Sequence, residues 1–230
     1  MCIRDSYQGS LGSSVIKVFD LTAASTGISV KAARAAGIDC ESVVLSPGSH
    51  AGYYPGATPM TMKVVFERET LRLLGAQIVG VDGVDKRIDV LATAIQAGIR
   101  ADKLKDLDLA YAPPYSSAKD PVNMAGFMIE NVDSGILKQW HWEQEPDLPR
   151  DGSVQLLDVR TVGEYGRGHI DGFMNIPIDD LRARLGGLTW QSLFMLFAKV
   201  VFAATSLVAF SLSTVLTAIT SRAVIVSLLL

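Results

Sequence analysis

The sequence predicts an α+β fold, in which an antiparallel sheet with helices is followed by an incomplete α/β unit and an apolar tail. Three observations lead to this interpretation. Up to about residue 131, strand-like and helix-like segments interleave without a regular strand–helix–strand rhythm, which favours an antiparallel sheet backed by helices. A shorter alternation of strands and helices occupies residues 153–188. From residue 189 to residue 230 the only charged residues are Lys199 and Arg222.

The chain begins with strands joined by loops. Residues 1–6 fit no element and are interpreted as a non-native leader, so the first domain is expected to span residues 7–131. Alternation predicts a strand over residues 15–20, and residues 21–27 lead away from it. A short helix over residues 29–36 is closed by a glycine, and residues 42–45 form the next strand.

A hairpin and three helices complete this domain. Residues 60–67 and 72–81 read as its paired strands. Residues 85–96 form a helix with one apolar face, and residues 101–107 form a second helix. Pro121 takes a favourable first position in a helix that runs to about Asn131. The apolar face of the first helix consists of Ile88, Leu91, Ala92 and Ile95.

A linker and a small second unit follow. Residues 132–152 are interpreted as the linker, because Pro, Glu and Asp cluster in its second half. Residues 153–188 alternate like an α/β domain but are too few to bury a core alone. The expected elements are a strand over 154–159, a turn or short helix over 164–169, a strand over 170–176 and a helix over 179–185.

Charge and cysteine content exclude several classes of function. The net charge is −3 and no basic run is present, which argues against binding of nucleic acid. Cys2 and Cys40 lie far apart and form no CxxC motif, so we expect neither a disulfide framework nor a metal site. Cys40 is interpreted as an ordinary thiol, and a reducing, cytoplasmic compartment is expected.

Two loops rich in glycine and proline carry tyrosines. Tyr111 and Tyr115 flank two prolines, which restrict the backbone and can hold a phenol in a fixed position. A held phenol can donate a hydrogen bond to a developing anion such as a leaving thiolate. The residue types alone favour the other interpretation, two packed tyrosines in a rigid turn, and the same alternatives apply to Tyr53 and Tyr54. His50 is interpreted as structural, because no Cys, Asp or Glu motif accompanies it.

Five motifs together resemble the C-terminal domain of coenzyme A-disulfide reductases, which are FAD-dependent pyridine nucleotide-disulfide oxidoreductases. The resemblance is nearly continuous from residue 7 to about residue 131. Its motifs are YQGSLGSSVIKVFDL from Tyr7, SHAGYYPG from Ser49, LGAQIVG from Leu74, GVDKRID from Gly83 and YAPPYS from Tyr111.

The resemblance implies a role in trans. In this family the domain forms the homodimer interface and reaches the partner's active site, where a cysteine forms a mixed disulfide with coenzyme A. The implied catalytic residues are Tyr53 and Tyr111, which would stabilise the departing thiolate or supply its proton. FAD and NAD(P)H would be bound in the full-length protein and not by this chain, because no GxGxxG motif and no match to the redox cysteine is present. The chain alone is expected to be inactive.

Residues 153–188 resemble the N-terminal half of a rhodanese domain, which implies a fused sulfur-carrier domain. Such domains carry a cysteine, in a Cys-x-x-Gly-x-Arg loop, that accepts sulfur as a persulfide. Asp158 and Arg160 are interpreted as a structural ion pair at a strand end. The matching residues are LLDVR from Leu156, Glu164-Tyr165, GHI from Gly168, Gly172 and NIP from Asn175.

The apolar tail, residues 189–230, allows two interpretations. Residues 200–219 contain no charge and are long enough to span a membrane, although their serines and threonines weaken that signal. Alternatively, a one-base shift of the reading frame near Leu188 allows a Cys-x-x-Gly-x-Arg peptide with its cysteine at the Phe197–Ala198 junction, and we favour this frameshift. A genuine tail would instead make the chain a membrane-tethered, rhodanese-like binding protein. A dimerisation module without chemistry is the third possibility.

Overall fold

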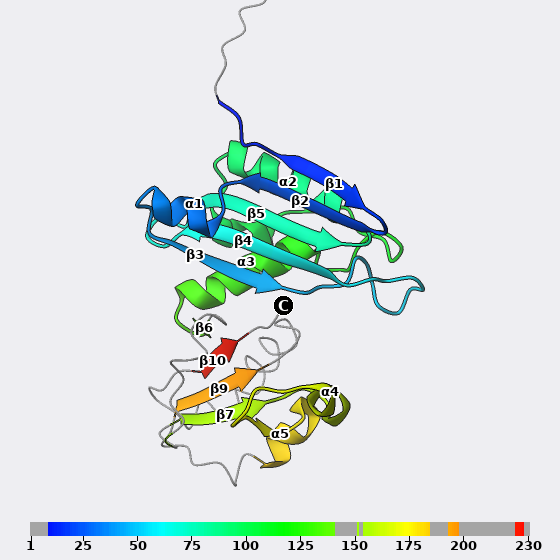
Figure 1. The fold of residues 1–230 in the computed structure, drawn as a ribbon. Coiled ribbons are helices and arrows are strands. Elements are labelled where there is room, and N and C mark those ends of the chain that lie inside the picture. Colours follow the sequence, from blue (N-terminus) through cyan, green and yellow to red (C-terminus); the bar gives the residue numbers. More distant parts are fainter. Residues whose placement is uncertain (1–8, 141–150, 152–153, 185–192, 198–223, 228–230) are drawn as a thin grey trace, which may run out of the picture. The chain divides into compact units, whose positions relative to one another are not determined.

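The computed structural model describes residues 9–140, 151, 154–184, 193–197 and 224–227 (Figure 1). The structure divides into two compact units, one formed mainly by residues up to Gly126 and the other mainly by residues from Phe127 onward. Each unit contains a five-stranded sheet.

The first sheet has the strand order β1-β2-β5-β4-β3. The pairs β1–β2, β2–β5 and β4–β5 are antiparallel, which confirms the predicted α+β class. Alternate side chains of β4, those of Met60, Met62 and Val64, are almost fully buried, as expected for a strand with one face on the core. The strands are β1 (Ser14–Val18), β2 (Leu21–Gly27), β3 (Cys40–Leu45), β4 (Met60–Glu67) and β5 (Leu73–Gly80).

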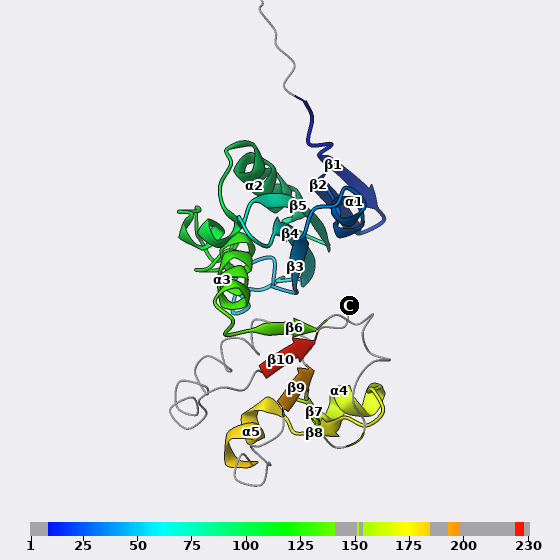
Figure 2. The ribbon, with the colours of Figure 1, turned by 90° about the vertical axis from the view of Figure 1, so that its left-hand side faces the viewer.

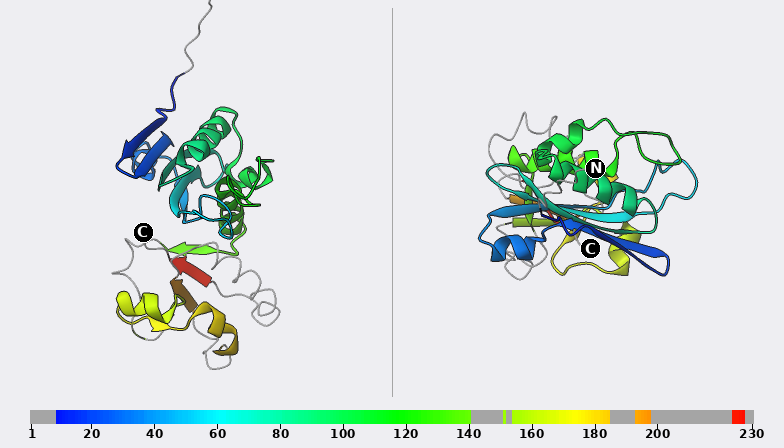
Figure 3. Two further views of the ribbon diagram at one scale, coloured as in Figure 1. Left: turned by 90° about the vertical axis from the view of Figure 1, so that its right-hand side faces the viewer. Right: turned by 90° about the horizontal axis from the view of Figure 1, so that it is seen from above.

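Helices cover this sheet. Helix α2 and the beginning of α3 lie on one face, and the short helix α1 lies on the other (Figures 2 and 3). Helix α1 begins after Ser29, whose side chain accepts a hydrogen bond from the Ala32 N–H, and Gly37 follows it with φ +73°. The helical segments are α1 (Val30–Ala35), α2 (Val84–Gln96), the 3₁₀ helix η1 (Ala101–Asp106) and α3 (Pro121–Asp133).

Strand β2 corrects the expectation that residues 21–27 merely lead away from the first strand. The segment LTAASTG is poor in strand-forming residues, but it lies between β1 and β5 and pairs with both. Gly27 lies opposite Gly75, and a side chain at Gly75 would overlap the Ile28 backbone. Tertiary pairing and this close backbone approach therefore outweigh the weak local propensity.

The buried face of α2 also differs from the prediction. Ile88 and Leu91 are buried as expected, but Ala94 is buried in place of Ala92 and Ile95, which are half-buried. Arg87 is buried on the same helix, although a charged residue is normally expected at the surface. The helix predicted over residues 101–107 is the 3₁₀ segment η1.

The second unit is an α/β unit with a parallel sheet of order β6-β10-β9-β7-β8. Its described core includes Leu156, Leu157, Phe173 and Ile176. The strand expected over residues 170–176 is only two residues long. Its elements are β6 (Lys138–Trp140), β7 (Val154–Asp158), α4 (Val162–Arg167), β8 (Met174–Asn175), α5 (Ile178–Arg184), β9 (Leu193–Phe197) and β10 (Val224–Ser227).

Parts of the linker and of the apolar tail contribute strands to this second sheet. Strand β6 comes from the segment interpreted as a linker, whereas β9 and β10 come from the tail. Within the described ranges, no helix is long and apolar enough to cross a membrane. The uncharged stretch 200–219 and most of the proposed frameshifted loop lie outside the described residues.

Candidate functional site

The loop between β3 and β4 carries Tyr53. The two ends of this loop are held together by an isolated antiparallel β-bridge between Gly48 and Pro59 and by a hydrogen bond of 2.8 Å from the Ser49 N–H to the Thr58 carbonyl. At its tip the Tyr54 N–H donates to the Ala51 carbonyl at 2.9 Å, which forms a turn around Tyr53. The glycines and prolines of this loop therefore build an ordered hairpin-like structure.

The loop between η1 and α3 carries Tyr111. The backbone N–H groups of Tyr115 and Ser116 donate to the Ala112 carbonyl, at 2.9 and 3.1 Å. Two prolines occupy the interior of this turn, Pro113 and Pro114, and neither could supply an N–H to a neighbour. The turn therefore fixes the chain immediately after Tyr111.

The two loops meet at their tyrosines. The Tyr53 and Tyr111 hydroxyl oxygens lie 2.7 Å apart and share a hydrogen bond, although the residues are 58 positions apart in sequence. A backbone hydrogen bond of 3.1 Å from the Ala51 N–H to the Ser116 carbonyl joins the same loops. Both tyrosines are exposed, at 76% and 47% of their surface, so the hydroxyl pair is accessible from outside the domain.

The hydroxyl pair can donate a hydrogen bond to a third group. The hydrogen bond with Tyr53 is the main influence on the pKa of Tyr111 and raises it above the ordinary 10.0, with smaller contributions from desolvation and from charge repulsion. Tyr111 therefore keeps its proton at neutral pH. Two phenols carry two hydrogens, and their mutual bond uses one of them. The other O–H remains available for an acceptor.

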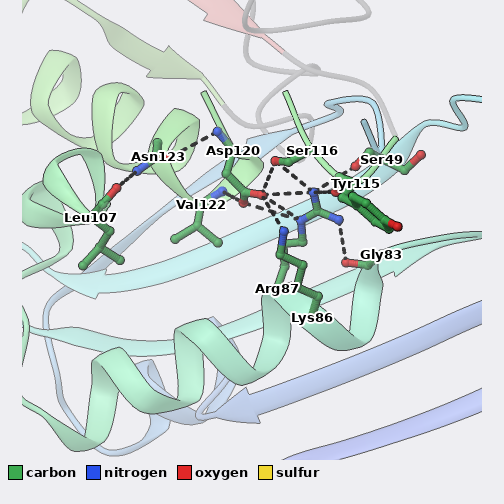
Figure 4. Close-up of polar contacts among 10 residues, drawn as sticks. All are labelled: Ser49, Gly83, Lys86, Arg87, Leu107, Tyr115, Ser116, Asp120, Val122 and Asn123. Carbon is green, nitrogen blue, oxygen red and sulfur yellow. Dashed lines mark hydrogen bonds and ion pairs between the residues drawn. The ribbon is translucent and has the colours of Figure 1, made fainter. Parts of the chain in front are cut away.

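A buried arginine lies behind the two loops (Figure 4). Arg87 is 1% exposed, and its Nη2 atom donates to the Ser49 carbonyl at 2.8 Å and to the Tyr115 carbonyl at 3.3 Å. Its Nη1 atom donates to the Gly83 carbonyl at 3.1 Å. Arg87 thus touches the backbone of both tyrosine loops without contacting either phenol of the pair.

Asp120 balances the charge of Arg87. It is 3% exposed, and its Oδ2 atom lies 3.0 Å from Arg87 Nη2. Its Oδ2 atom also accepts a hydrogen bond of 2.7 Å from the Ser116 hydroxyl. Its Oδ1 atom accepts one of 3.0 Å from the Val122 N–H, in the manner of a helix N-cap. Asp120 therefore joins α3, the Tyr111 loop and Arg87.

These contacts keep Asp120 ionised. Burial is the largest single influence on its pKa and opposes ionisation. The hydrogen bonds from Ser116 and from the Val122 N–H, together with the positive charge of Arg87, outweigh the burial. The net result is a pKa below the ordinary value of 3.8. The pair is therefore a charged, fully hydrogen-bonded unit at neutral pH.

The other aromatic residues of these loops lie outside the pair. Tyr54 contacts the edge of His50, with ring centroids 5.7 Å apart. His50 is buried and its Nδ1 atom lies 3.2 Å from the Ala51 carbonyl, in keeping with the structural interpretation. Tyr115 is exposed, and its carbonyl rather than its phenol contacts Arg87. No group of three potential metal ligands occurs among the residues that the structure describes.

Sequence reasoning did not assign Arg87 and Asp120 to the site. Two signals pointed toward them. Arg87 interrupts the apolar stripe of α2 next to Ile88, and Asp120 directly precedes the proline that opens α3. Neither signal identifies a partner, because Arg87 and Asp120 are 33 residues apart in sequence and meet only in the folded chain.

The described residues of the first unit do not fit a dinucleotide cofactor. Helix α2 follows β5 with Gly83 at its N-cap, which superficially resembles a phosphate-binding turn. However, β5 is antiparallel to both neighbours and Asp85 places a negative charge in the first turn of α2. The Arg87 guanidinium occupies the space beside Gly83. No flavin chemistry can therefore be assigned to this turn.

In the second unit, Asp158 and Arg160 form the predicted ion pair. Arg160 Nη2 lies 2.6 Å from Asp158 Oδ2, and Asp158 is fully buried. The same guanidinium group donates to the Gly168 carbonyl at 2.9 Å. Asn175 donates to the carbonyls of Asp158 and Arg160, both at 2.9 Å. The pair thus fixes the carboxyl end of β7, where Asp158 lies in register with Phe197 of β9.

Comparison with known proteins identifies relatives for both units. Residues 13–121 match the model of the pyridine nucleotide-disulphide oxidoreductase dimerisation domain. The coenzyme A disulfide reductase of Staphylococcus haemolyticus is 46% identical over 126 residues, which cover 55% of this chain and 28% of that enzyme.

Two solved structures resemble almost the whole chain. The reduced Bacillus anthracis protein CoADR-RHD is 39% identical, with a TM-score of 0.86 over 98% of this chain and 39% of that one. An NAD-dependent persulfide reductase from A. fulgidus is 35% identical, with a TM-score of 0.81 over the same shares. The chain therefore spans well under half the length of each of these relatives.

Proposed function

We propose that this chain, whose residues 13–121 match the dimerisation domain of the pyridine nucleotide-disulphide oxidoreductases, is the C-terminal part of a flavin- and NAD(P)H-dependent reductase. Its substrate is coenzyme A disulfide or a related persulfide or polysulfide, as the names of its relatives suggest. Flavin and NAD(P)H are held by other parts of that protein. The contribution of this chain is a homodimer interface and a pair of tyrosines that act on the partner subunit.

The observation that carries this proposal is the 2.7 Å hydrogen bond between the exposed hydroxyls of Tyr53 and Tyr111. When a thiolate of the partner subunit attacks a disulfide, the displaced sulfur leaves with the electron pair of the S–S bond and a negative charge. The free O–H of the tyrosine pair donates a hydrogen bond to that sulfur. An exposed pair on a dimerisation domain is suited to meet a group on another subunit.

The pKa of Tyr111 favours hydrogen bonding over complete proton transfer. A thiol has a pKa of about 8.5, well below the raised value of Tyr111. Passing the whole proton from Tyr111 to a thiolate is therefore disfavoured by more than about tenfold. The tyrosine pair consequently stabilises the departing thiolate as a hydrogen-bond donor, and solvent supplies the proton after departure.

A chimeric enzyme tests the role of the tyrosines. Residues 13–131 of this chain replace the matching segment of the S. haemolyticus reductase, and NAD(P)H-dependent reduction of coenzyme A disulfide is measured. We expect Tyr53→Phe and Tyr111→Phe each to lower kcat by roughly 100-fold, the usual scale for losing such a donor. Tyr54→Phe and Tyr115→Phe are the matched controls and should retain kcat. Equal effects of all four substitutions would contradict the assignment.

The chain alone should be inactive in this reaction. Purified and mixed with NADH or NADPH and coenzyme A disulfide, it should oxidise no nicotinamide and carry no flavin absorbance. Stoichiometric flavin binding by the isolated chain would show that the assignment of flavin to other parts of the protein is wrong.

For the second unit we propose a rhodanese-like sulfur carrier. The parallel pairing of β7 with β8 and the buried Asp158–Arg160 pair at the end of β7 support this proposal. In the favoured frameshift interpretation, the sulfur-accepting cysteine is encoded at the Phe197–Ala198 junction, and Phe197 lies in register with Asp158. Sequencing of the coding DNA around Leu188 tests the idea, and it fails if no one-base shift yields the Cys-x-x-Gly-x-Arg loop.

A further inference from the structure

We propose that the buried Arg87–Asp120 pair is a positioning device that locks the two tyrosine loops together and sets the contact between Tyr53 and Tyr111. The effect on catalysis rests on the proposed function, whereas the effect on the tyrosine pair does not. Arg87 and Asp120 touch neither phenol of the pair, so they are positioning residues and not catalytic ones.

A single nitrogen atom of Arg87 connects both loops. Nη2 donates to the Ser49 carbonyl, four residues before Tyr53, and to the Tyr115 carbonyl, four residues after Tyr111. From Ser49 the chain enters the turn at Ala51 that presents Tyr53. From Tyr115 it returns through the hydrogen-bonded turn at Ala112 that follows Tyr111. Each loop is therefore fixed to Arg87 close to its tyrosine.

Asp120 fixes the direction of the guanidinium group. Its carboxylate accepts from Nε at 3.2 Å and from Nη2 at 3.0 Å, so two donors of the planar group are directed at one residue. Ser116, which follows Tyr115, donates to the same carboxylate at 2.7 Å. The Gly83 carbonyl holds Nη1 at 3.1 Å on the opposite side. With the guanidinium fixed in this way, a shift of either loop must break hydrogen bonds inside a buried cluster.

Lysine cannot reproduce this arrangement. An ammonium group keeps the positive charge beside Asp120, but its three donors radiate from one atom. It cannot reach the carbonyls of Gly83, Ser49 and Tyr115 with the geometry that the planar fork provides. Arg87→Lys therefore keeps the positive charge beside Asp120 but removes the hydrogen bonds that connect the two loops.

The experiment measures the titration of Tyr111 by NMR in the full chain labelled with [¹³Cζ]-tyrosine. The Tyr111 signal is assigned by its loss in Tyr111→Phe, and folding is followed in the same spectra. We expect Arg87→Lys to lower the pKa of Tyr111 toward the ordinary 10.0, because the hydrogen bond with Tyr53 is weakened. Leu91→Ala is the control, since it creates a cavity at a buried apolar position one turn further along the same helix and leaves Arg87 and Asp120 in place.

The proposal would be overturned if folded Arg87→Lys protein kept the pKa of Tyr111 as high as in the unmodified chain. It would also be overturned if Leu91→Ala lowered the pKa of Tyr111 as much as Arg87→Lys does. If Arg87→Lys does not fold, Asp120→Asn provides the second test, because it keeps the size of the side chain while removing the charge that orients Arg87. Asp120→Asn should shift the same signal in the same direction, and an unchanged Tyr111 titration in this variant overturns the proposal as well.

The catalytic consequence is measured separately in the chimeric enzyme. Arg87→Lys should lower kcat by on the order of 100-fold, as expected for a misplaced donor, while KM for NAD(P)H stays unchanged. If Tyr53→Phe and Tyr111→Phe leave kcat intact, the proposed function fails while the NMR result on the lock still stands. If kcat depends on the tyrosines but Arg87→Lys alters neither kcat nor the Tyr111 titration, the positioning role of Arg87 and Asp120 is refuted while the proposed function stands.

Discussion

Removal of the Arg87 side chain should produce the largest loss of stability among the polar substitutions considered in the first unit. Arg87→Met keeps much of the side-chain volume but leaves the buried Asp120 with the partly exposed Lys86, 3.9 Å away, in place of the buried guanidinium. Breaking one partner of a buried pair typically costs about 3–5 kcal/mol. Three carbonyls, those of Ser49, Gly83 and Tyr115, also lose a donor, at roughly 1 kcal/mol each where water cannot replace it.

Protonation of Asp120 limits this loss. Protonating a carboxyl with an ordinary pKa near 3.8 at pH 7 costs about 4 kcal/mol. If burying the unpaired charge costs more than this, Asp120 takes up a proton instead. Without the arginine, Asp120 loses a positive charge and a hydrogen bond that lower its pKa, so its pKa in the folded state is higher in Arg87→Met than in the unmodified chain. At pH 7 the contribution of Asp120 is therefore limited to about 4 kcal/mol, and the three carbonyls add up to roughly 3 kcal/mol. The deficit of Arg87→Met should shrink as the pH falls through the folded-state pKa of Asp120 in the variant.

Urea denaturation of the full chain measures the deficit, followed through backbone amide signals of β4 and β5 so that the transition belongs to the first unit. Lys103→Met is the control. Lys103 forms ion pairs with Asp106 and Asp102 but is 55% exposed, so its loss should cost less than about 1 kcal/mol. A deficit below about 1 kcal/mol for Arg87→Met at pH 7, or one that grows on acidification, would refute the reasoning.

Four further outcomes follow from the same structure. Tyr53→Phe should lower the pKa of Tyr111 toward 10.0, whereas Tyr54→Phe should not, as read from tyrosinate absorbance and NMR. The lowered pKa of Asp120 contributes stability that is present above its unfolded value near 3.8 and lost as the pH falls through the lower folded value, so Asp120→Asn should flatten this acidic part of the stability profile. Gly126→Ala should destabilise the chain in urea despite alanine's better helix propensity, because its Cβ would overlap the backbone at Lys105; a gain in stability would contradict that packing. Phe19 is 94% exposed beside the exposed apolar strand β1, so Phe19→Asp should weaken the proposed homodimer in sedimentation experiments, and an unchanged dimer would exclude this surface.

Local patterns were sufficient to predict much of the first unit. The β4–β5 hairpin, α1 with Ser29 and Gly37 at its ends, and α3 opened by Pro121 all follow from alternation, caps and breakers in the sequence. Strand β2 could not be predicted in this way, because its small and polar residues have little strand propensity of their own. Its strand conformation depends on β1 and β5, which lie on either side of it.

The site was predictable only in part. Tyr53 and Tyr111 were proposed as site residues from the resemblance of their motifs, but no local pattern gives the contact between their hydroxyls. The same holds for Arg87 and Asp120, whose pairing depends on how α2 lies against the start of α3. Periodicity treats a charged residue as a surface residue, whereas Arg87 is buried because Asp120 and three carbonyls satisfy its donors.

The central claim is that the tyrosine pair acts on the disulfide of the partner subunit, and mixed dimers of the chimeric reductase test it most directly. One subunit carries Tyr53→Phe and Tyr111→Phe, and the other lacks the redox cysteine of the reductase. If the tyrosines act in trans, each mixed dimer retains one intact site and should show about half the activity of the unmodified dimer. If they act within their own subunit, neither site is complete, and mixed dimers no more active than the two parent variants would contradict the account.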